Sequence, residues 1–198
     1  MKDDSSPDKR KEDLAIDEGE TEEDHSKNEQ SDDTQVSKPQ SSRFANLENI
    51  NFDFIAYDQD ICILGSKGSG KSYLANQLLK GLNGIHVWVY DFNHQFHSSR
   101  AIVFNDLTKM LEVSDSAKRG HYILQPHDNS ENTFRRFCEE GFKRGNLVLM
   151  MDEAHSFLTK QKQLKEFNNI ILSGRPRGIS CITISSRPAS LPNNVLTN

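Results

Sequence analysis

Short apolar runs alternate with helical patterns along most of the chain. Consecutive apolar residues are typical of strands buried on both faces, whereas apolar residues spaced by three and four predict a helix with one buried face. Residues 131–143 show the helical spacing, and residues 147–151 form a continuous apolar run. Such alternation predicts an α/β fold, with a mainly parallel sheet flanked by helices. We expect strands at residues 61–64, 85–90, 147–151 and 179–184, shorter strands at 101–104 and 122–124, and helices at 72–80, 131–143 and from about 164 to 174.

The first 40 residues differ in composition from the rest. They contain 14 acidic and 6 basic residues, a net charge of −8 in a chain of net charge −5, so the remainder carries +3. Because this segment has few large apolar residues, it cannot bury enough surface to offset the entropy lost on ordering. We therefore predict a disordered acidic tail over residues 1–43 and one folded domain over 44–198, which is long enough for a core. The tail is either a solubilising extension or an arm that competes with an anionic ligand, and its sequence identifies no partner.

The cysteines and the hydropathy indicate a reducing compartment. Cys62, Cys138 and Cys181 are far apart in the chain and have apolar neighbours, which favours buried thiols over disulfides or a metal site. No apolar stretch approaches the roughly 20 residues that span a membrane, and the acidic N-terminus does not resemble a signal peptide. We therefore expect a cytoplasmic protein with no membrane contact.

Residues 65–72 read GSKGSGKS, between the first expected strand and the first expected helix. This is the GxxxxGK[ST] phosphate loop in the context that it requires, which disfavours a chance Gly/Ser-rich linker. Glycines allow a tight turn that brings backbone N–H groups and a helix N-terminus against phosphate oxygens. Lys71 is expected to reach the β- and γ-phosphates, and Ser72 to coordinate Mg²⁺. The expected phosphate-binding residues are Gly65, Ser66, Lys67, Gly68, Ser69, Gly70, Lys71 and Ser72.

Asp152 and Glu153 directly follow the apolar run at 147–151. A carboxylate at the end of a buried strand can hold Mg²⁺ or its water, the role expected for Asp152, and the adjacent Glu153 can polarise an attacking water. Solvated acidic strand ends are common in α/β proteins, but this one follows a phosphate loop by 80 residues. We therefore expect the nucleotide to be hydrolysed.

Residues 152–155, Asp-Glu-Ala-His, also spell the box that names one helicase class. We do not adopt that interpretation, because the Ser-Ala-Thr motif and the second motor domain of those enzymes are not visible in the sequence. His155 is interpreted as a helix-start residue or a contact that depends on the nucleotide state, rather than as a catalytic base.

The last 25 residues indicate which family of phosphate-loop proteins the chain resembles. Residues 174–180 read GRPRGIS, residues 182–188 read ITISSRP, and residues 191–198 read LPNNVLTN. This run resembles the FtsK/HerA superfamily of DNA-pumping ATPases, in which a "GR..GIS" turn leads into a strand ending "TQRP" and then "LP..VL.N". Residues 89–94, VYDFNH, are similar to the family's Asp-containing end of the second strand. The resemblance covers about residues 58–198.

What this resemblance implies is a RecA-like (ASCE) P-loop motor, a Mg²⁺-dependent ATP hydrolase coupled to DNA translocation. Members act as rings, usually hexameric, on double-stranded DNA in repair, segregation, conjugation or viral genome packaging. A viral member would act in the host cytoplasm. The choice of ATP over GTP rests on the resemblance. Members normally continue past this last Asn with at least one more strand, so the chain is expected to be a fragment or a reduced member.

The resemblance also implies roles for residues near the C-terminus. Arg175 or Arg177 matches an arginine finger that reaches the γ-phosphate of a neighbouring subunit, and the alternative is that one or both lie in a surface turn or cap the preceding helix. Ser186 stands where the family has a γ-phosphate-sensing Gln, so sensing here is weakened. Arg187 is either a second phosphate-facing cation or a brace at the strand end.

Two other functions remain open. The first is an assembly or switch ATPase of the zonula-occludens-toxin type, which does not act on DNA and usually carries a membrane segment. The second is a non-catalytic nucleotide-binding adaptor, which the intact Lys71, Ser72, Asp152 and Glu153 disfavour. A local basic patch is either a nucleic-acid contact or a solvated helix face. It comprises Lys160, Lys162 and Lys165.

Overall fold

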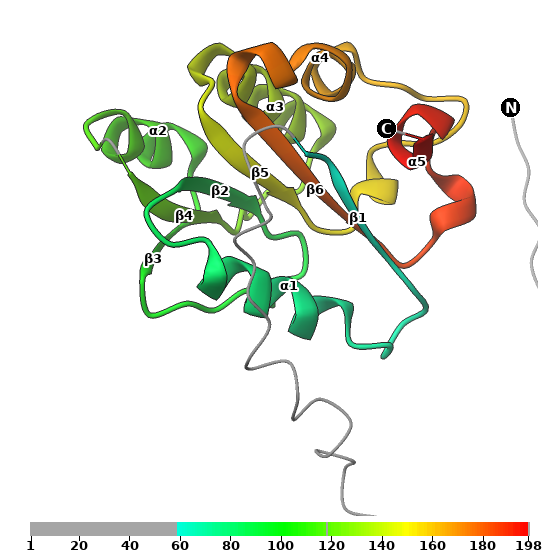
Figure 1. The fold of residues 1–198 in the computed structure, drawn as a ribbon, viewed down its shortest axis with the longest axis horizontal. Coiled ribbons are helices and arrows are strands. Elements are labelled where there is room, and N and C mark those ends of the chain that lie inside the picture. The colour runs from blue at the N-terminus through cyan, green and yellow to red at the C-terminus, as the bar shows by residue number, and fades with distance from the viewer. Residues whose placement is uncertain (1–58, 118, 198) are drawn as a thin grey trace, which may run out of the picture. The chain divides into compact units, whose positions relative to one another are not determined.

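A six-stranded parallel sheet forms the centre of the molecule (Figure 1). The computed structural model describes residues 59–117 and 119–197, so the predicted tail and its boundary at residue 43 lie outside the described residues. The strand order is β1-β6-β5-β2-β4-β3. The strands are β1 (Ile61–Leu64), β2 (His86–Tyr90), β3 (Ala101–Phe104), β4 (Gly120–Leu124), β5 (Leu147–Met151) and β6 (Ile179–Ser185).

The last strand of the sheet lies between the first strand and β5. β6 pairs with β1 on one side, with Ile182 opposite Ile61, and with β5 on the other, with Ile182 opposite Met150. Because all pairs are parallel, the carboxyl ends of β1, β6, β5 and β2 meet at one edge. In open α/β sheets this edge is where ligands bind.

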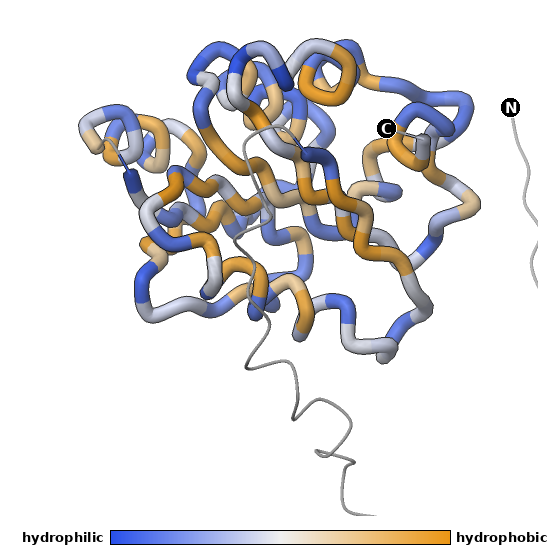
Figure 2. Tube along the Cα trace, in the orientation of Figure 1, coloured by the Kyte–Doolittle hydropathy of each residue, from blue (hydrophilic) through white to orange (hydrophobic). Residues whose placement is uncertain are grey.

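Helices cover both faces of the sheet, with α1 on one face and α2, α3 and α4 on the other (Figure 1). Val87 and Val89 of β2 pack in the core beneath α1, whereas Trp88 and Tyr90 pack in the opposite core. Burial on both faces explains the continuous apolar runs in the sequence, which Figure 2 shows along the central strands. The helices are α1 (Lys71–Gly81), α2 (Leu107–Asp115), α3 (Glu131–Arg144), α4 (Lys165–Ser173) and α5 (Asn193–Thr197), with 3₁₀ turns η3 (Ala154–Ser156), η4 (Arg175–Arg177) and η5 (Pro188–Ser190).

Helix α3 forms where the apolar spacing predicts it. Its first turn is capped by Ser130, whose hydroxyl accepts from the Thr133 N–H. Phe134 and Phe137 are fully buried against the sheet. Gly141 allows the close approach of α3 to β5, because a Cβ there would lie 2.9 Å from a methyl carbon of Leu149.

The predicted α/β fold is confirmed, with α2 as an element that the sequence interpretation missed. Asp106 caps this helix by accepting from the Lys109 N–H, and Leu107 and Met110 are buried on its inner face. Cys138 and Cys181 are buried and Cys62 is half-buried, and all three are free thiols as predicted. None of the helices in the described ranges is long and apolar enough to cross a membrane.

Candidate active site

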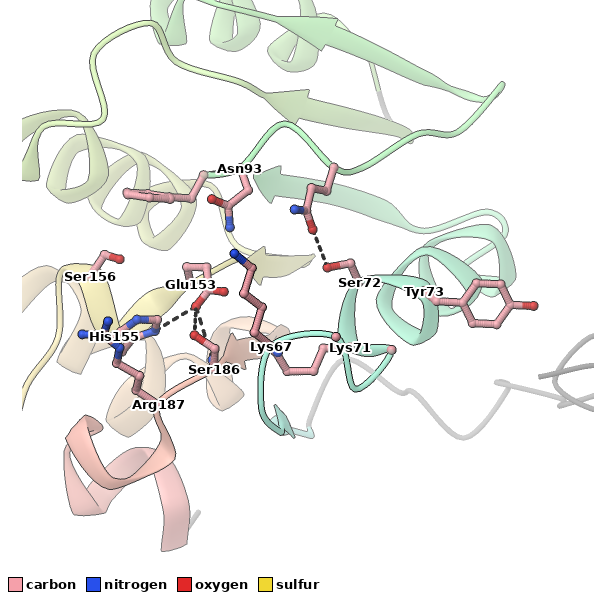
Figure 3. A pocket seen from close by; sticks show the side chains of 14 residues that line it. Lys67, Lys71, Ser72, Tyr73, Asn93, Glu153, His155, Ser156, Ser186 and Arg187 are labelled. Atoms are coloured by element: carbon pink, nitrogen blue, oxygen red, sulfur yellow. Dashed lines mark hydrogen bonds and ion pairs between the residues drawn. The ribbon is translucent and has the colours of Figure 1, made fainter. Parts of the chain in front are cut away.

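A cleft of about 640 Å³ opens at the carboxyl edge of the sheet (Figure 3). It brings together four segments far apart in sequence: the loop after β1, the loop after β2, the end of β5 and the end of β6. Its lining residues are Lys67, Gly68, Gly70, Lys71, Ser72, Tyr73, Phe92, Asn93, Gln95, Glu153, His155, Ser156, Ser186 and Arg187.

The loop between β1 and α1 has the backbone that its glycines predict. Gly68 and Gly70 have φ values of 80° and 91°, in the left-handed region that favours glycine. Gly70 is the N-cap of α1, so the helix N-terminus faces the cleft. The Lys71 ammonium donates to the Ser66 carbonyl across 3.0 Å. Of the expected loop residues, Gly65, Ser66 and Ser69 belong to the turn without lining the cleft.

The acidic pair at the end of β5 divides between core and cleft. Asp152 is 2% exposed and its Oδ2 accepts from Asn93 Nδ2 at 3.2 Å. Burial raises the pKa of Asp152 to about 6, helped by the neighbouring carboxylates of Glu153 and Asp91. Glu153 lines the cleft and has a φ of 47°, a backbone conformation that a non-glycine residue adopts at a cost. This turn directs Glu153 into the cleft while Asp152 stays beneath it.

Three donors converge on one oxygen of Glu153 (Figure 3). Its Oε2 lies 3.2 Å from the Ser186 N–H, 2.9 Å from the Ser186 hydroxyl and 2.9 Å from Nδ1 of His155. His155 Nδ1 also lies 3.2 Å from the Ser185 hydroxyl. Burial lowers the pKa of His155 and the Glu153 carboxylate opposes that shift. A neutral His155 with its proton on Nδ1 can donate to Glu153. Ser186, which stands where the family has a phosphate-sensing Gln, thus contacts Glu153 here.

The loop after β2 contributes two polar cleft residues, beside Phe92, that the sequence interpretation missed. Asn93 contacts Asp152, and Gln95 Oε1 accepts from the Ser72 hydroxyl at 2.7 Å. The sequence resembles the family at Asp91, but its pattern gave no role to Asn93 or Gln95. Their proximity to Ser72 and Asp152 depends on the packing of β2 beside β5, which no local signal reveals.

The three predicted arginines lie at two different edges of the sheet. Arg187 follows β6 and lines the cleft, and its backbone N–H donates to the Ser185 hydroxyl. Arg175 and Arg177 precede β6, in η4 at the opposite edge. Arg177 donates to the carbonyls of Phe142 and Lys143, at 2.8 and 2.9 Å, and so caps the C-terminal end of α3. Arg177 therefore caps a helix, but this helix is α3 and not the preceding helix, α4, which the alternative interpretation named.

The basic patch is partly neutralised. Lys162 pairs with Glu131 at the start of α3. Lys160 and Lys165 lie on either side of it in the loop before α4 and in its first turn. This pairing favours the solvated-face interpretation for Lys162.

A family model described as an AAA domain matches residues 56–184. Among solved structures, the genome-packaging NTPase B204 from Sulfolobus turreted icosahedral virus 2 in complex with ATP-gammaS is 24% identical, with a TM-score of 0.55 over 70% of each chain. The same NTPase with AMPPCP is 21% identical, with a TM-score of 0.56 over 70% of each chain. The N-terminal domain of zonular occludens toxin from Neisseria meningitidis is 16% identical, with a TM-score of 0.42 over 69% of this chain and 71% of that one. No curated protein matches the chain in sequence. At these identities the B204 structures show the fold alone, and together with the AAA domain match they confirm the P-loop ATPase part of the predicted resemblance.

Proposed function

Because the chain belongs to the AAA domain family of P-loop ATPases, we propose that it hydrolyses ATP with Mg²⁺ and uses the energy to move double-stranded DNA as a homo-oligomeric ring. One observation carries the hydrolytic part. The phosphate loop, the Asp152-Glu153 pair and the polar end of β6 line or border a single cleft at the carboxyl edge of the sheet.

The phosphate loop would hold the triphosphate. The N-terminus of α1 and the turn at residues 65–70 offer backbone N–H groups to phosphate oxygens. Lys71 needs only to exchange the Ser66 carbonyl for the β- and γ-phosphates, because both partners are oxygen acceptors. Lys67 and Arg187 add positive charge to the cleft.

The residues beside the loop fit Mg²⁺. The Ser72 hydroxyl and the Asp152 carboxylate are the hard oxygen ligands that Mg²⁺ prefers, together with phosphate oxygens and water. Within residues 59–117 and 119–197 no group of three or more His, Cys, Asp and Glu side chains could hold a metal by itself. Burial raises the pKa of Asp152 most, and the carboxylates of Glu153 and Asp91 raise it further; a divalent cation would offset their negative charge. When bound, Mg²⁺ would neutralise charge on the β- and γ-phosphate oxygens.

Glu153 is the proposed base that polarises the attacking water. It lies in the cleft, next to the expected metal ligand, and its donors Ser186 and His155 fix its orientation. A base beside the metal suits an in-line attack on the γ-phosphate.

The positions of Arg175 and Arg177 support a ring. They precede β6, and the cleft lies at the other end of this seven-residue strand, a span of roughly 20 Å at about 3.3 Å per residue. An arginine at that edge is too far to serve its own cleft. It would serve the cleft of an adjacent subunit, as a finger acting in trans.

The DNA part of the proposal rests on the run at 174–198 and on the shared fold. The structures most informative for the fold are those of an NTPase described as genome-packaging. The net charge of +3 beyond residue 40 is compatible with an anionic substrate. The cytoplasm, of a cell or of an infected host, is the proposed place of action.

The test is the ATPase rate with and without duplex DNA, measured beside the mass of the particle in solution. We expect an oligomer whose ATPase rate rises with duplex DNA. DNA affinity should fall with salt, with a slope of about −0.9 per phosphate contact. A rate that does not respond to DNA would favour the assembly ATPase instead. Absence of hydrolysis in any condition would favour the nucleotide-binding adaptor.

A further inference from the structure

The loop after β2, residues 91–97, touches both residues expected to hold Mg²⁺. Gln95 Oε1 lies 2.7 Å from the Ser72 hydroxyl, and Asn93 Nδ2 lies 3.2 Å from Oδ2 of Asp152. Ser72 belongs to α1 and Asp152 follows β5, so one loop joins two segments separated by 80 residues. Figure 3 shows Asn93 above Glu153 and the dashed bond from Ser72 to the loop.

Hydrogen bonds to a buried carboxylate fix the backbone of this loop. Asp91 is fully buried, and its carboxylate accepts from the N–H groups of Gln95 and Phe96, both at 2.9 Å. Gln125 donates to the same carboxylate at 2.8 Å. The Phe96 ring is fully buried beneath the loop. These contacts fix the backbone at Gln95, although its side chain is exposed.

The loop is also joined to the phosphate-loop helix. Asn76 of α1 donates to the carbonyls of Ser72 and Gln95, at 3.0 and 3.1 Å, and accepts from the His97 N–H at 3.0 Å. Three bonds through one side chain therefore tie the first turn of α1 to residues 95–97. Gln95 and Ser72 keep their relative positions as a consequence.

The bond from Ser72 to Gln95 has a definite polarity. A hydroxyl has one proton and two lone pairs, and the glutamine oxygen accepts the proton. The lone pairs of Ser72 Oγ then point away from Gln95 and stay open to a cation. Acceptors that take the proton of a metal ligand in this way orient the ligand, and their loss typically lowers metal affinity by 10- to 100-fold.

Asn93 orients the other expected metal ligand, Asp152. Its side-chain amide donates to Oδ2 at 3.2 Å, which fixes the orientation of the Asp152 carboxylate. A carboxylate has about four acceptor sites on its two oxygens, so this bond leaves others for a cation or its water.

We propose that Gln95 and Asn93 are positioning residues for the Mg²⁺ ion, which orient Ser72 and Asp152 as its ligands. The proposal rests on the Mg²⁺-dependent nucleotide binding proposed above and adds the loop after β2 to the metal site. Neither residue need touch the nucleotide.

The test measures the affinity for ATP-gammaS by calorimetry, once with Mg²⁺ and once in EDTA. The ratio of the two affinities reports how strongly metal and nucleotide reinforce each other. Gln95→Met keeps the length of the side chain and removes the acceptor. We expect it to reduce this ratio about 10-fold while the affinity in EDTA is unchanged. Asn93→Leu should reduce the ratio in the same direction.

Two control variants separate positioning from general damage. Gln95→Glu keeps an acceptor oxygen and should retain the wild-type ratio. Gln77→Met makes the same substitution on α1 at a residue that does not line the cleft, and should also retain it. Thermal unfolding of each variant checks the fold, which should be unaffected because Gln95 is exposed.

Three results would overturn the proposal. The first is a wild-type ratio in Gln95→Met, and the second is an equal loss in Gln95→Met and Gln95→Glu. The third is a loss of affinity in EDTA as large as that in Mg²⁺, which would assign Gln95 to the nucleotide. If the wild-type protein itself gains no affinity from Mg²⁺, the proposed Mg²⁺ dependence fails and the positioning role fails with it. If Mg²⁺ raises the affinity for ATP-gammaS equally in the wild type and in Gln95→Met, only the positioning role fails.

Discussion

At the scale of single residues, the cleft is organised around Glu153. The Oε2 atom of Glu153 has three donors, from Ser186 and His155, while Asp152 beside it is nearly buried. We predict that Glu153→Gln retains ATP binding and lowers the hydrolysis rate by about 10²–10⁴-fold, the usual contribution of a positioned base. Single-turnover hydrolysis and ATP binding measured on the same preparation test this. A variant that turns over at the wild-type rate would remove Glu153 from the proposed role.

His155 offers a second test of the same arrangement. Its Nδ1 lies 2.9 Å from Glu153, and an asparagine amide can place a donor close to that position. We predict that His155→Ala lowers kcat roughly 10-fold with little change in KM, since hydrogen bonds to charged groups contribute about 1.5–3 kcal/mol. His155→Asn should recover most of kcat. Equal losses in the two variants would show that the donor does not matter.

The sequence predicts those site residues whose neighbours in space are also neighbours in the chain. The phosphate loop and the Asp152-Glu153 pair are local motifs, and the structure puts the loop and Glu153 at the cleft. The contacts of Ser186 with Glu153 and of Gln95 with Ser72 bridge 33 and 23 residues. They depend on which strands lie side by side, and a single sequence gives no direct signal of that.

At the scale of elements, continuous apolar runs predict the strands because the sheet is buried on both faces. β1, β3 and β5 have the expected bounds, and β6 is one residue longer than expected. α2 was not predicted although it is as long as α4, because it buries only two large apolar side chains, Leu107 and Met110. It also follows an exposed edge strand, in which Ile102 and Val103 are 50% and 48% exposed. Aspartate is a typical N-cap residue, so Asp106 was the signal in the sequence for the start of α2. Its side chain accepts from the N–H of Lys109, three residues later.

The cap of α2 allows a direct test of this element. Asp106→Ala removes the acceptor for the Lys109 N–H, at 2.9 Å, and should lower the free energy of unfolding by about 1 kcal/mol. Asp106→Asn keeps a capping oxygen and should lose much less. Urea denaturation of the two variants beside the wild type makes the comparison. Similar losses for Ala and Asn would indicate that Asp106 acts through its charge.

The start of β4 carries a buried titrating group. His121 is 6% exposed and one ring nitrogen lies 2.7 Å from the Leu82 carbonyl. Burial, the largest cause, and Arg100 lower its pKa, and the bond to Leu82 opposes them. The unfolded chain therefore binds a proton more readily than the folded one, so stability is complete above about pH 6.5 and falls as the pH drops below it.

We predict that His121→Gln reduces the loss of stability between pH 7 and pH 5. Glutamine can still donate to the Leu82 carbonyl but does not titrate in this range. The free energy of unfolding, measured by urea denaturation at several pH values, should fall more steeply in the wild type than in the variant. Parallel pH profiles would show that His121 does not contribute.

At the scale of the whole molecule, the sites are proposed to be shared between subunits. Arg175→Ala should abolish hydrolysis in a subunit's neighbour, and Lys71→Ala in the subunit itself. Mixing the two inactive variants should therefore restore part of the ATPase activity, because some interfaces combine an intact loop with an intact arginine. Absence of rescue at every mixing ratio would count against shared sites.

Arg177→Ala is harder to interpret, because Arg177 also caps α3 and its loss can destabilise the fold. The thermal unfolding of this variant must therefore be compared with that of Arg175→Ala.

β6 has a mechanical consequence in such a ring. The strand is buried at all seven positions and is clamped between β1 and β5. The N-terminal end of β6 follows the turn that contains Arg175. Ser186 lies just past its C-terminal end and donates a hydrogen bond to Glu153. A strand that is hydrogen-bonded on both sides moves as one unit, so a displacement at one end is transmitted to the other. A neighbouring subunit that displaced η4 would thus also move Ser186 against the Glu153 carboxylate, roughly 20 Å away, and hydrolysis in one subunit would set the timing in the next.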